Sequence, residues 1–304
     1  MINRKRSLEK DLAAIKRVER GVRTVRRIKK AGGKLRIRRK IALTAGTAVF
    51  LIAPGAVSRK AAAPFEGRNF AHRGLHTRDK RIPENSLAAF EAAAAQGYGI
   101  ELDVQLSSDG KVVVFHDDTL DRVCGVHSRV DEKTYDELHA ISLCGTGETV
   151  PLFEDVLKCV RGRGPLIVEL KTGRHNRELC RKTLKLLRAY KGDVCIESFD
   201  PRIVMWFRFH ARKMVRGQLS CPPRDYTPQE ASRPQAFLLG NCLMNFLGRP
   251  QFIAYKIGRK PLSVKLCELM GAMRVCWTSR EWVHEKKNDA VIFEFYNPGK
   301  KFKK

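Results

Sequence analysis

From about residue 65 to the C-terminus, short apolar runs of β-type composition alternate with stretches whose apolar residues recur at helical spacing. This alternation is typical of a parallel sheet whose strands are joined by crossover helices. A (β/α)8 barrel needs eight strands, whereas nine runs qualify, so one of them is an additional strand or not a strand. The run at Phe252-Tyr255 is the weakest. The nine runs centre on Asn69-Ala71, Ile100-Val104, Val112-Phe115, Leu166-Leu170, Val194-Ile196, Val215-Leu219, Phe252-Tyr255, Arg274-Trp277 and Val291-Phe293.

The length of this region, about 240 residues, matches the roughly 250 residues typical of a TIM barrel. An open doubly wound sheet is the structural alternative. Two features disfavour it: no Gly-x-Gly-x-x-Gly loop follows the first strand, and polar residues cluster directly after strands, where barrel enzymes build their active sites. We therefore predict an α/β fold, a TIM-like (β/α)8 barrel over residues 65–304 with a small insertion after its third strand.

Positive charge is concentrated ahead of this region. The 304 residues include 59 Lys and Arg against 32 Asp and Glu, a formal net charge of +27. Residues 1–40 hold 17 of the basic residues and three acidic ones, with few large apolar side chains. Because such a segment has little to pack into a core, we predict a basic N-terminal arm over residues 1–40 that is solvated or bound to a surface.

Residues 41–57 read IALTAGTAVFLIAPGAV and carry no charge. This length is at the short end of the range that can span a membrane. A transmembrane helix, a secretory signal with a long basic front and a buried helix of the barrel domain are the three interpretations. We favour the transmembrane helix, because the basic residues directly before it would stay in the cytoplasm and place residue 58 onward on the outer side.

Partners follow from the charge pattern. A basic arm next to an apolar segment favours an anionic lipid surface. Nucleic acid is disfavoured, because aromatic residues do not interleave with the basic ones.

Nine cysteines are scattered without a Cys-x-x-Cys pair, so we expect free thiols, several in the core. Free thiols are more typical of the cell interior, which conflicts with the predicted outer side. The oligomeric state is not determined by the sequence.

Acidic residues follow the strand runs. Side chains alternate along a strand, so Glu101 and Asp103 share one face, and so do Glu169 and Lys171. In a barrel both pairs would point inward at the mouth. Neighbouring buried carboxylates are costly unless a cation neutralises them, and oxygen ligands suit Ca²⁺ or Mg²⁺. We predict one divalent metal ion; the alternative is a strand end that neighbouring Arg and Lys side chains neutralise.

Histidines end two of the strand runs, His72 beside Arg73 and His116 after the third run. Two histidines can hold opposite protonation states near pH 7, one accepting and one donating a proton. Beside a metal and the cations Arg73 and Lys171, they indicate phosphoryl chemistry, although each histidine alone is more often structural. Kinases and serine hydrolases are disfavoured, because neither a Gly-rich phosphate loop nor a Gly-x-Ser-x-Gly elbow is present.

Motifs in a fixed order along the chain support this chemistry. They are Ala71-His72-Arg73-Gly74, Pro83-Glu84-Asn85-Ser86, Ile100-Glu101-Leu102-Asp103-Val104, Ser108-Asp109-Gly110, His116-Asp117-Asp118-Thr119-Leu120-Asp121-Arg122, Val168-Glu169-Leu170-Lys171, Glu197-Ser198-Phe199 and Trp277-Thr278. With them, residues 65–295 resemble the glycerophosphodiester phosphodiesterase family. The resemblance implies a metal-dependent TIM-like barrel that hydrolyses glycerophosphodiesters to glycerol 3-phosphate and an alcohol. The segments Ser279-Arg280 and Val291–Phe295 depart from the family pattern, and late loops of a barrel usually shape the substrate pocket.

The resemblance also implies residue roles. The catalytic acid/base pair would be His72 and His116, the metal ligands Glu101, Asp103 and Glu169, and the substrate- or phosphate-binding residues Arg73, Lys171, Glu84, Asn85 and Trp277. We expect Glu84 and Asn85 near the mouth and Trp277 in an apolar wall of the substrate pocket. The alternatives are a helix start for Glu84 and Asn85 and an ordinary core aromatic for Trp277. Which histidine is the acid is left open.

Two other functions remain. A lysophospholipase D-like hydrolase acting on membrane lysophospholipids would explain the apolar run and the basic arm, which could hold the site at a lipid surface. A non-catalytic, membrane-tethered binding module is the second, but it has no need of two histidines and three carboxylates together.

Overall fold

The computed structural model describes residues 46–302; residues 1–45 and 303–304 lie outside the described part. The chain divides into two compact units, residues 1–50 and residues 51–304. In the first unit, the described residues 46–50 are helical and exposed. The predicted basic arm over residues 1–40 lies outside the described residues.

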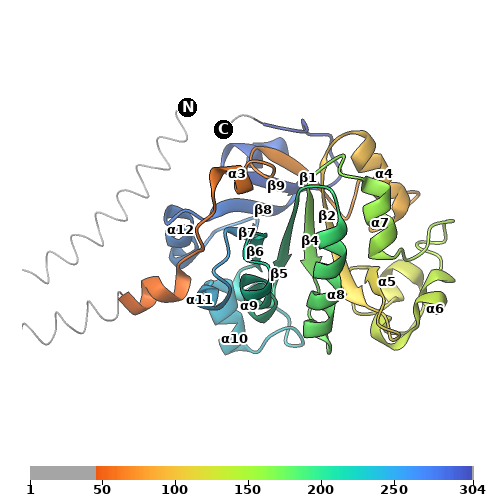
Figure 1. The fold of residues 1–304 in the computed structure, drawn as a ribbon, viewed down its shortest axis with the longest axis horizontal. Coiled ribbons are helices and arrows are strands. Elements are labelled where there is room, and N and C mark those ends of the chain that lie inside the picture. The colour runs from red at the N-terminus through yellow and green to blue at the C-terminus, as the bar shows by residue number, and fades with distance from the viewer. Residues whose placement is uncertain (1–45, 303–304) are drawn as a thin grey trace, which may run out of the picture. The chain divides into compact units, whose positions relative to one another are not determined.

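Within the described residues, eight parallel strands of the second unit close into a barrel (Figure 1). The closure joins β1 to β2, with Phe70 opposite Gly99 and His72 opposite Glu101. Only glycine fits at residue 99, because a Cβ there would lie 2.4 Å from the Phe70 ring. In pairing order the barrel strands are β1 (Arg68–His72), β9 (Ala290–Phe293), β8 (Met273–Ser279), β7 (Phe252–Lys256), β6 (Val215–Ser220), β5 (Val194–Ser198), β4 (Leu166–Leu170) and β2 (Gly99–Leu106).

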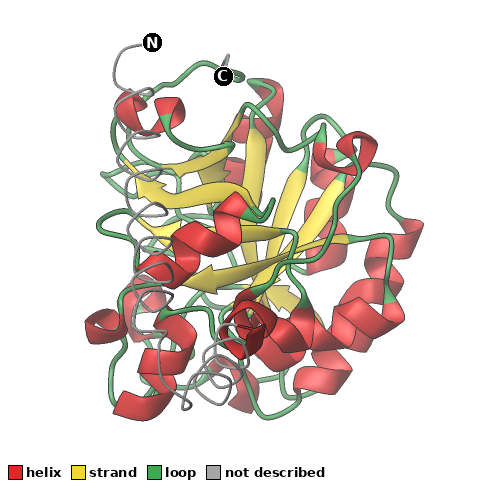
Figure 2. Ribbon diagram, turned by 90° about the vertical axis from the view of Figure 1, so that its left-hand side faces the viewer, coloured by secondary structure: helices red, strands yellow, loops and turns green. Residues whose placement is uncertain are grey.

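Helices surround the strands (Figure 2). Their local sequence explains where they begin and which face they bury: Asp200 caps the helix that starts at Pro201, and Phe153 and Val160 lie on one buried helical face. The described helices are α3 (Arg59–Ala62), α4 (Leu87–Ala95), α5 (Asp121–Cys124), α6 (Tyr135–His139), α7 (Phe153–Val160), α8 (Asn176–Ala189), α9 (Pro201–His210), α10 (Arg233–Gly240), α11 (Asn245–Gly248) and α12 (Leu262–Leu269), with 3₁₀ turns at Val130–Glu132, Pro223–Asp225 and Trp282–Lys286.

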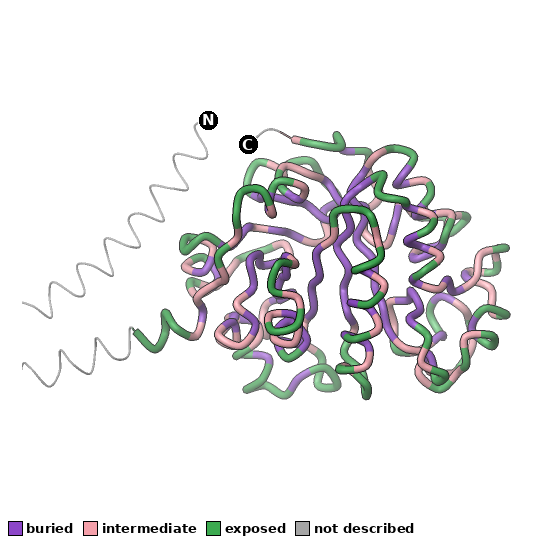
Figure 3. The backbone as a smooth tube through the Cα atoms, viewed as in Figure 1, coloured by how far each residue is buried: buried purple, intermediate pink, exposed green. Residues whose placement is uncertain are grey.

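The barrel strands are buried on both faces (Figure 3). On β4, Leu166 and Val168 pack outward with the apolar residues of the helices, whereas Ile167 belongs to a separate cluster inside the barrel. By alternation Glu169 also faces inward, one layer nearer the C-terminal end. Phe65, just after α3, is part of the interior cluster. The interior is therefore apolar toward the N-terminal ends of the strands and charged at the C-terminal mouth.

All nine predicted strand runs are strands. The additional one is β3 (Val112–Val114), which pairs antiparallel with the C-terminal part of β2. The prediction that Phe252-Tyr255 is the weakest candidate strand is wrong, because this run is β7, a full member of the barrel. The run is short and apolar because both of its faces are buried. The closure of β1 on β2 excludes the open doubly wound alternative.

The predicted small insertion follows β3. Its short helices α5 and α6 pack around an apolar cluster of their own, which includes Val113, Leu120 and Leu138. A capping box between Thr134 and Glu137 starts α6. The insertion lies next to the C-terminal part of β2, so it forms one side of the barrel mouth.

The last five residues of the predicted transmembrane segment, residues 53–57, are not helical. In the described residues helix ends at residue 52, and residues 53–57 form no regular element. Arg249 Nη1 donates to the Ala53 carbonyl at 2.9 Å, and the Gly55 N–H donates to the Pro250 carbonyl at 2.9 Å. These partners precede β7, so residues 53–57 cross the end of the barrel opposite the mouth. No helix among residues 46–302 is both long and apolar enough to span a membrane.

The nine cysteines all lie in the described part and are free thiols. Six of them are buried, among them Cys195 inside the barrel and Cys180 on α8. The expectation of free thiols with several in the core is confirmed.

Candidate active site

Carboxylates from two neighbouring strands converge at the mouth of the barrel. Glu101 and Asp103 lie on β2, and Asp103 is in register with Glu169 on β4. All three are buried, and each offers an oxygen atom that lies within 4.8 Å of the other two. The structure thus brings the three predicted metal ligands together.

The two predicted phosphate-binding cations lie against these carboxylates. Lys171 Nζ is 2.9 Å from Glu169 Oε1 and 3.6 Å from Asp103 Oδ1. Arg73 Nε is 3.5 Å from Asp103 Oδ2, and the Arg73 N–H donates to Glu101 Oε2 at 3.1 Å. Arg73 has φ of 54°, a left-handed conformation that few residues other than glycine adopt. Such conformations persist where the surroundings enforce them, and they cluster at functional sites.

The cluster is electrostatically unbalanced. Burial, together with the charges of Asp103 and Glu169, raises the pKa of Glu101 well above its ordinary value. Burial likewise raises the pKa of Glu169, although Lys171 opposes this. Burial also acts against ionisation of Asp103, but His116, Lys171 and Arg73 beside it hold its pKa well below the usual range. Additional positive charge at this place would keep all three carboxylates ionised.

A divalent cation fits this donor set. Asp103 Oδ1 is buried and accepts no hydrogen bond. The other oxygen, Asp103 Oδ2, accepts from Asn85 Nδ2 at 2.9 Å, which fixes the orientation of the carboxylate. Carboxylate oxygens are hard ligands of the kind that Ca²⁺ and Mg²⁺ take. Glu101, Asp103 and Glu169 are the residues that would hold the ion.

His72 ends β1 and is oriented by a carboxylate from the far end of the chain. Its Nδ1 lies 3.1 Å from Glu294 Oε2. Burial alone would raise the pKa of Glu294, but hydrogen bonds from His72 and Arg280 lower it to about 2. Burial lowers the pKa of His72 to about 4, so the ring is neutral near pH 7. Because an ionised Glu294 can only accept, Nδ1 carries the proton and Nε2 is free to take one.

His116 lies just after β3, at the start of the insertion. Its Nδ1 is 2.5 Å from Asp117 Oδ1, and Arg122 Nε donates to Asp117 Oδ2 at 2.6 Å. Gln105 on β2 donates to the carbonyls of Phe115 and Asp117, both at 2.9 Å. The loop is therefore fixed on both sides of His116, and the ring orientation is set through Nδ1.

The Pro83-Glu84-Asn85-Ser86 loop begins a helix and also lines the mouth. Ser86 caps α4 by accepting from the Ala89 N–H at 3.1 Å. Glu84 Oε1 accepts from Arg73 Nη1 at 2.6 Å and from Arg122 Nη2 at 2.7 Å. Glu84 thereby links the Arg73 side of the site to the loop that carries His116. This motif therefore both starts a helix and contributes residues to the mouth of the barrel.

Trp277 lies at the C-terminal end of β8 and is half-buried. Its indole N–H donates to the Ala254 carbonyl at 3.0 Å, and its ring packs edge-on against Phe199 with centroids 5.6 Å apart. The two rings form an apolar wall at the mouth, between the ends of β5 and β8.

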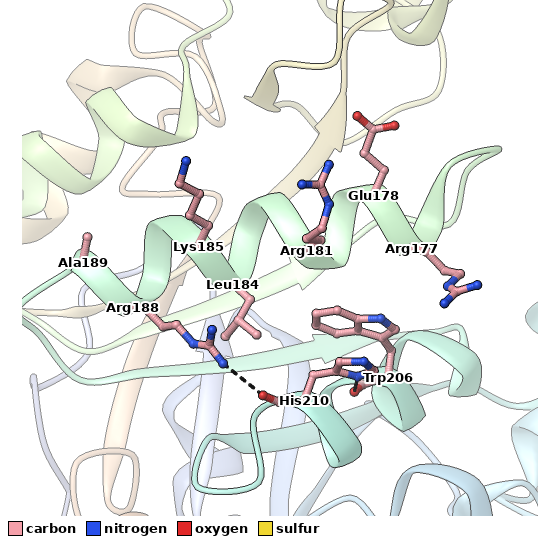
Figure 4. Close-up of a pocket in the computed structure, with 9 residues that line it drawn as sticks. All are labelled: Arg177, Glu178, Arg181, Leu184, Lys185, Arg188, Ala189, Trp206 and His210. Atoms are coloured by element: carbon pink, nitrogen blue, oxygen red, sulfur yellow. Dashed lines mark hydrogen bonds between the residues drawn. The ribbon is translucent and has the colours of Figure 1, made fainter.

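A second concave region is separate from this mouth. A groove of about 990 Å³ lies on the outside of the barrel between α8 and α9 (Figure 4). Arg181, Lys185 and Arg188 extend from α8 beside it, and on α9 the Trp206 ring stacks on the His210 ring. Arg188 Nη2 donates to the His210 carbonyl at 3.2 Å. No residue that we predicted for catalysis or binding lines this groove.

Some site residues were missed at the sequence level. Glu294 and Arg280 belong to the segments that depart from the family pattern, and yet Glu294 contacts His72 directly. Asp117 and Arg122 belong to the motif that begins at His116, but the sequence analysis assigned no role to either of them. Glu197, in the Glu-Ser-Phe motif, faces the same interior; only its place at a strand end could have drawn attention to it.

Known proteins resemble this chain in sequence and in fold. The model of the glycerophosphoryl diester phosphodiesterase family matches residues 72–295. A glycerophosphodiester phosphodiesterase of Bacillus altitudinis is 38% identical over 109 residues, which cover 34% of this chain and 43% of the relative. A rat lysophospholipase D is 29% identical over 153 residues, 46% of this chain and 47% of the relative. The chain thus spans less than half the length of these two relatives.

A solved structure extends the likeness to the whole barrel. The phosphodiesterase of Oleispira antarctica, in complex with its product sn-glycerol-3-phosphate, superposes with a TM-score of 0.61 at 21% identity. The match covers 77% of this chain and 94% of that chain. At this identity the likeness shows a shared fold.

Proposed function

We propose that this chain, which belongs to the glycerophosphoryl diester phosphodiesterase family, hydrolyses a glycerophosphodiester to glycerol 3-phosphate and an alcohol. The observation that carries the proposal is the pair of oriented histidines at the rim of one buried carboxylate cluster. A metal-binding barrel without catalysis would not need either ring held by its own carboxylate.

In the proposed mechanism His72 is the general base. It is neutral near pH 7, and its Nε2 is the unprotonated nitrogen because Nδ1 donates to Glu294. It removes the proton from the attacking hydroxyl group, either that of the glycerol or that of water. A base whose conjugate acid has a pKa of about 4 accepts a proton only as the nucleophile develops charge, which matches proton transfer in the transition state.

His116 is the proposed general acid. Asp117 fixes its Nδ1, so Nε2 is the atom that would give a proton to the oxygen of the leaving alcohol. Arg73 and Lys171 orient the phosphate oxygens and stabilise their charge. When bound by Glu101, Asp103 and Glu169, a divalent cation supplies Lewis acidity toward the phosphoryl oxygens.

Two similarities support this substrate class. The Bacillus relative is named a glycerophosphodiester phosphodiesterase, and the Oleispira structure holds sn-glycerol-3-phosphate as its product. Arg73 and Lys171, together with a cation held by the carboxylates, would offer this chain a place for the same phosphate group, and the Trp277–Phe199 wall offers an apolar surface for the rest of a substrate.

The first experiment measures glycerol 3-phosphate release from glycerophosphocholine by the full chain, with chelator and after adding back Ca²⁺ or Mg²⁺. We expect release that chelation abolishes and either ion restores. His116→Ala should lower the rate by about 10²- to 10⁴-fold, the usual contribution of general acid–base catalysis. The matched control is His127→Ala, an exposed histidine of the same insertion, which should leave the rate unchanged. Near-normal turnover by folded His116→Ala protein would refute the mechanism.

A lysophospholipase D-like activity is the second candidate, and exposed apolar residues near the mouth favour it. Trp282 and Val283 are 60% and 39% exposed, and Lys286 Nζ lies 4.7 Å from the Trp282 ring centroid. They follow Arg280, which contacts Glu294 in the site. An amphipathic aromatic beside lysine suits a lipid interface. The rat relative carries the name lysophospholipase D.

Turnover of lysophosphatidylcholine in vesicles, compared with glycerophosphocholine in solution, separates the two candidates. If the lipid is a substrate, Trp282→Ala should slow its hydrolysis and leave the soluble diester unaffected. A protein that ignores the acylated substrate is confined to water-soluble diesters.

We also propose, from the charge pattern of residues 1–57, that the chain associates with a membrane and carries its barrel on the outer side. Protease digestion of intact cells or spheroplasts tests this. If the protease cleaves the barrel only after the cells are lysed, the barrel lies on the inner side and the proposed orientation is wrong. If the protein is recovered in the fraction without membranes, the proposed membrane association is wrong.

A further inference from the structure

A fourth acidic side chain lies inside the barrel and is not among the predicted metal ligands. Glu197 on β5 is 1% exposed. Neither of its carboxylate oxygens has a hydrogen-bond partner. Buried carboxylates in proteins are normally paired or hydrogen-bonded, because desolvation of an unpartnered charge is expensive.

The side chain of Glu197 points toward the carboxylate cluster. Cys195, two residues earlier on β5, belongs to the interior cluster, so by alternation Glu197 also faces inward. Glu197 is the register partner of Glu169 on β4, where neighbouring strands lie about 4.8 Å apart. The charged groups that act on it are Glu101, Glu169, Asp103 and Lys171.

Nearby polar side chains do not satisfy this carboxylate. The Ser198 hydroxyl donates to the Leu170 carbonyl at 2.8 Å. The Gln218 amide on β6, one strand further round the barrel, donates to the carbonyls of Ser198, Phe199 and Leu219. A purely structural acid at this position would use one of these donors, and neither contacts it.

The side chains of Arg73 and Lys171 do not by themselves balance the carboxylates of the site when these are ionised. Glu101, Asp103, Glu169 and Glu197 contribute four negative charges when ionised, whereas Arg73 and Lys171 contribute two positive ones. The remaining two negative charges equal the charge of one Ca²⁺ or Mg²⁺ ion. The oxygens of Glu197 lie outside the set of three ligand atoms within 4.8 Å of one another, so its action is that of a charge next to the ligand shell.

We propose that Glu197 is a fourth carboxylate of the cation site, which raises the affinity for a divalent cation by its charge and destabilises the metal-free protein. This inference rests on the proposed metal site and deepens it. Loss of the Glu197 charge should therefore weaken cation binding and at the same time stabilise the metal-free protein. A residue that merely supports the fold would not give this combination, because its loss would destabilise the protein. Affinity for hard cations depends on the charge of the surrounding carboxylates, and groups next to the ligands typically change metal affinity by about 10- to 100-fold.

The test is Glu197→Gln in the full chain, which keeps the shape and removes the charge. Calorimetric titration with Ca²⁺, and separately with Mg²⁺, should show a dissociation constant raised by roughly tenfold or more. In chelator, the variant should melt at a higher temperature than the wild type. The matched control is Cys195→Ala, an uncharged change on the same face of the same strand, which should leave the cation affinity within twofold of the wild type.

Each outcome decides the proposal. An unchanged dissociation constant, or a lower melting temperature of the chelated variant, overturns it. Glu197→Leu is the second variant; if both variants fail to fold, the proposal is also wrong, because it predicts a more stable metal-free protein. Cation binding by wild-type protein that hydrolyses no diester would refute the proposed function and leave this inference standing. Failure of the wild type to bind either ion would refute the inference.

Discussion

At the scale of single residues, the candidate site contains two pairs in which a carboxylate holds a histidine ring in one orientation. Glu294 orients His72, and Asp117 orients His116, each through Nδ1. Arg280 donates twice to Glu294 Oε1, at 2.9 and 2.6 Å, which keeps that carboxylate ionised and in place. A neutral ring with a defined tautomer is what a general base requires.

Glu294→Gln tests this orientation. The amide can present its NH₂ group to Nδ1, which disfavours the tautomer with a free Nε2. We expect kcat to fall on the order of 10²-fold, within the range that general acid–base catalysis supplies, with little change in KM. Because the Glu294 hydrogen bond raises the pKa of His72 against the effect of burial, the acid limb of the pH–rate profile should move to lower pH. A variant with lower activity but an unmoved profile would assign Glu294 a merely structural role.

At the scale of elements, the segment before α3 belongs to the barrel unit. Ile52 is buried, and Asn245 Nδ2 donates to its carbonyl at 3.2 Å. Gly55 packs so closely on the Arg249 carbonyl that a Cβ would lie 2.3 Å from that oxygen. The Ser58 hydroxyl caps α3, which helps to close the interior at the end opposite the mouth.

Two truncations measure what this segment contributes. We expect the free energy of unfolding to be roughly 4 kcal/mol lower for a chain that begins at residue 59 than for one that begins at residue 51. The difference comes from two or three lost hydrogen bonds at about 1 kcal/mol each and from the lost burial of Ile52. Urea unfolding followed by circular dichroism gives the difference. Equal stability would show that residues 51–58 do not support the barrel.

At the scale of the whole molecule, the barrel separates an apolar interior from a charged mouth, and we expect the charged end to lower the stability of the protein when no cation is bound. Burial and neighbouring carboxylates raise the pKa of Glu101. A carboxyl group whose folded pKa is raised is protonated in the native state at low pH. The stability associated with that proton is lost as pH rises from the unfolded pKa through the folded one.

Cation binding should therefore stabilise the fold, and more so at higher pH. With free Ca²⁺ at a hundred times its dissociation constant, the gain is about 2.7 kcal/mol. For a domain of this size the melting temperature should rise by roughly 5–10 °C. At pH 5.5 the gain should be smaller than at pH 8, because protons compete with the ion for Glu101 and Glu169. Thermal unfolding at both pH values, with chelator or Ca²⁺, measures this; a gain that is larger at pH 5.5 would contradict it.

Much of this architecture was predictable from local patterns. Alternation along β2 and β4 puts Glu101, Asp103 and Glu169 on inward faces, because side-chain direction in a strand is a local property. The apolar runs are recognisable as strands, because a parallel strand covered on both sides must be apolar throughout. The order of the motifs indicates the family, and residues 72–295 belong to it.

Other features depend on how distant strand ends meet. Glu294 lies 222 residues from His72 in the chain, and only closure of the barrel brings them into contact. The role of Val112–Val114 as the additional strand follows from hydrogen bonds to the end of β2. The isolation of Glu197 follows from the register of β5 against its neighbours. The sequence itself thus determined the residue types and the direction of each side chain along its strand. Only the tertiary structure decided which strands pair, which side chains come into contact and which carboxylate is left without a partner, because register and closure are properties of many strands at once.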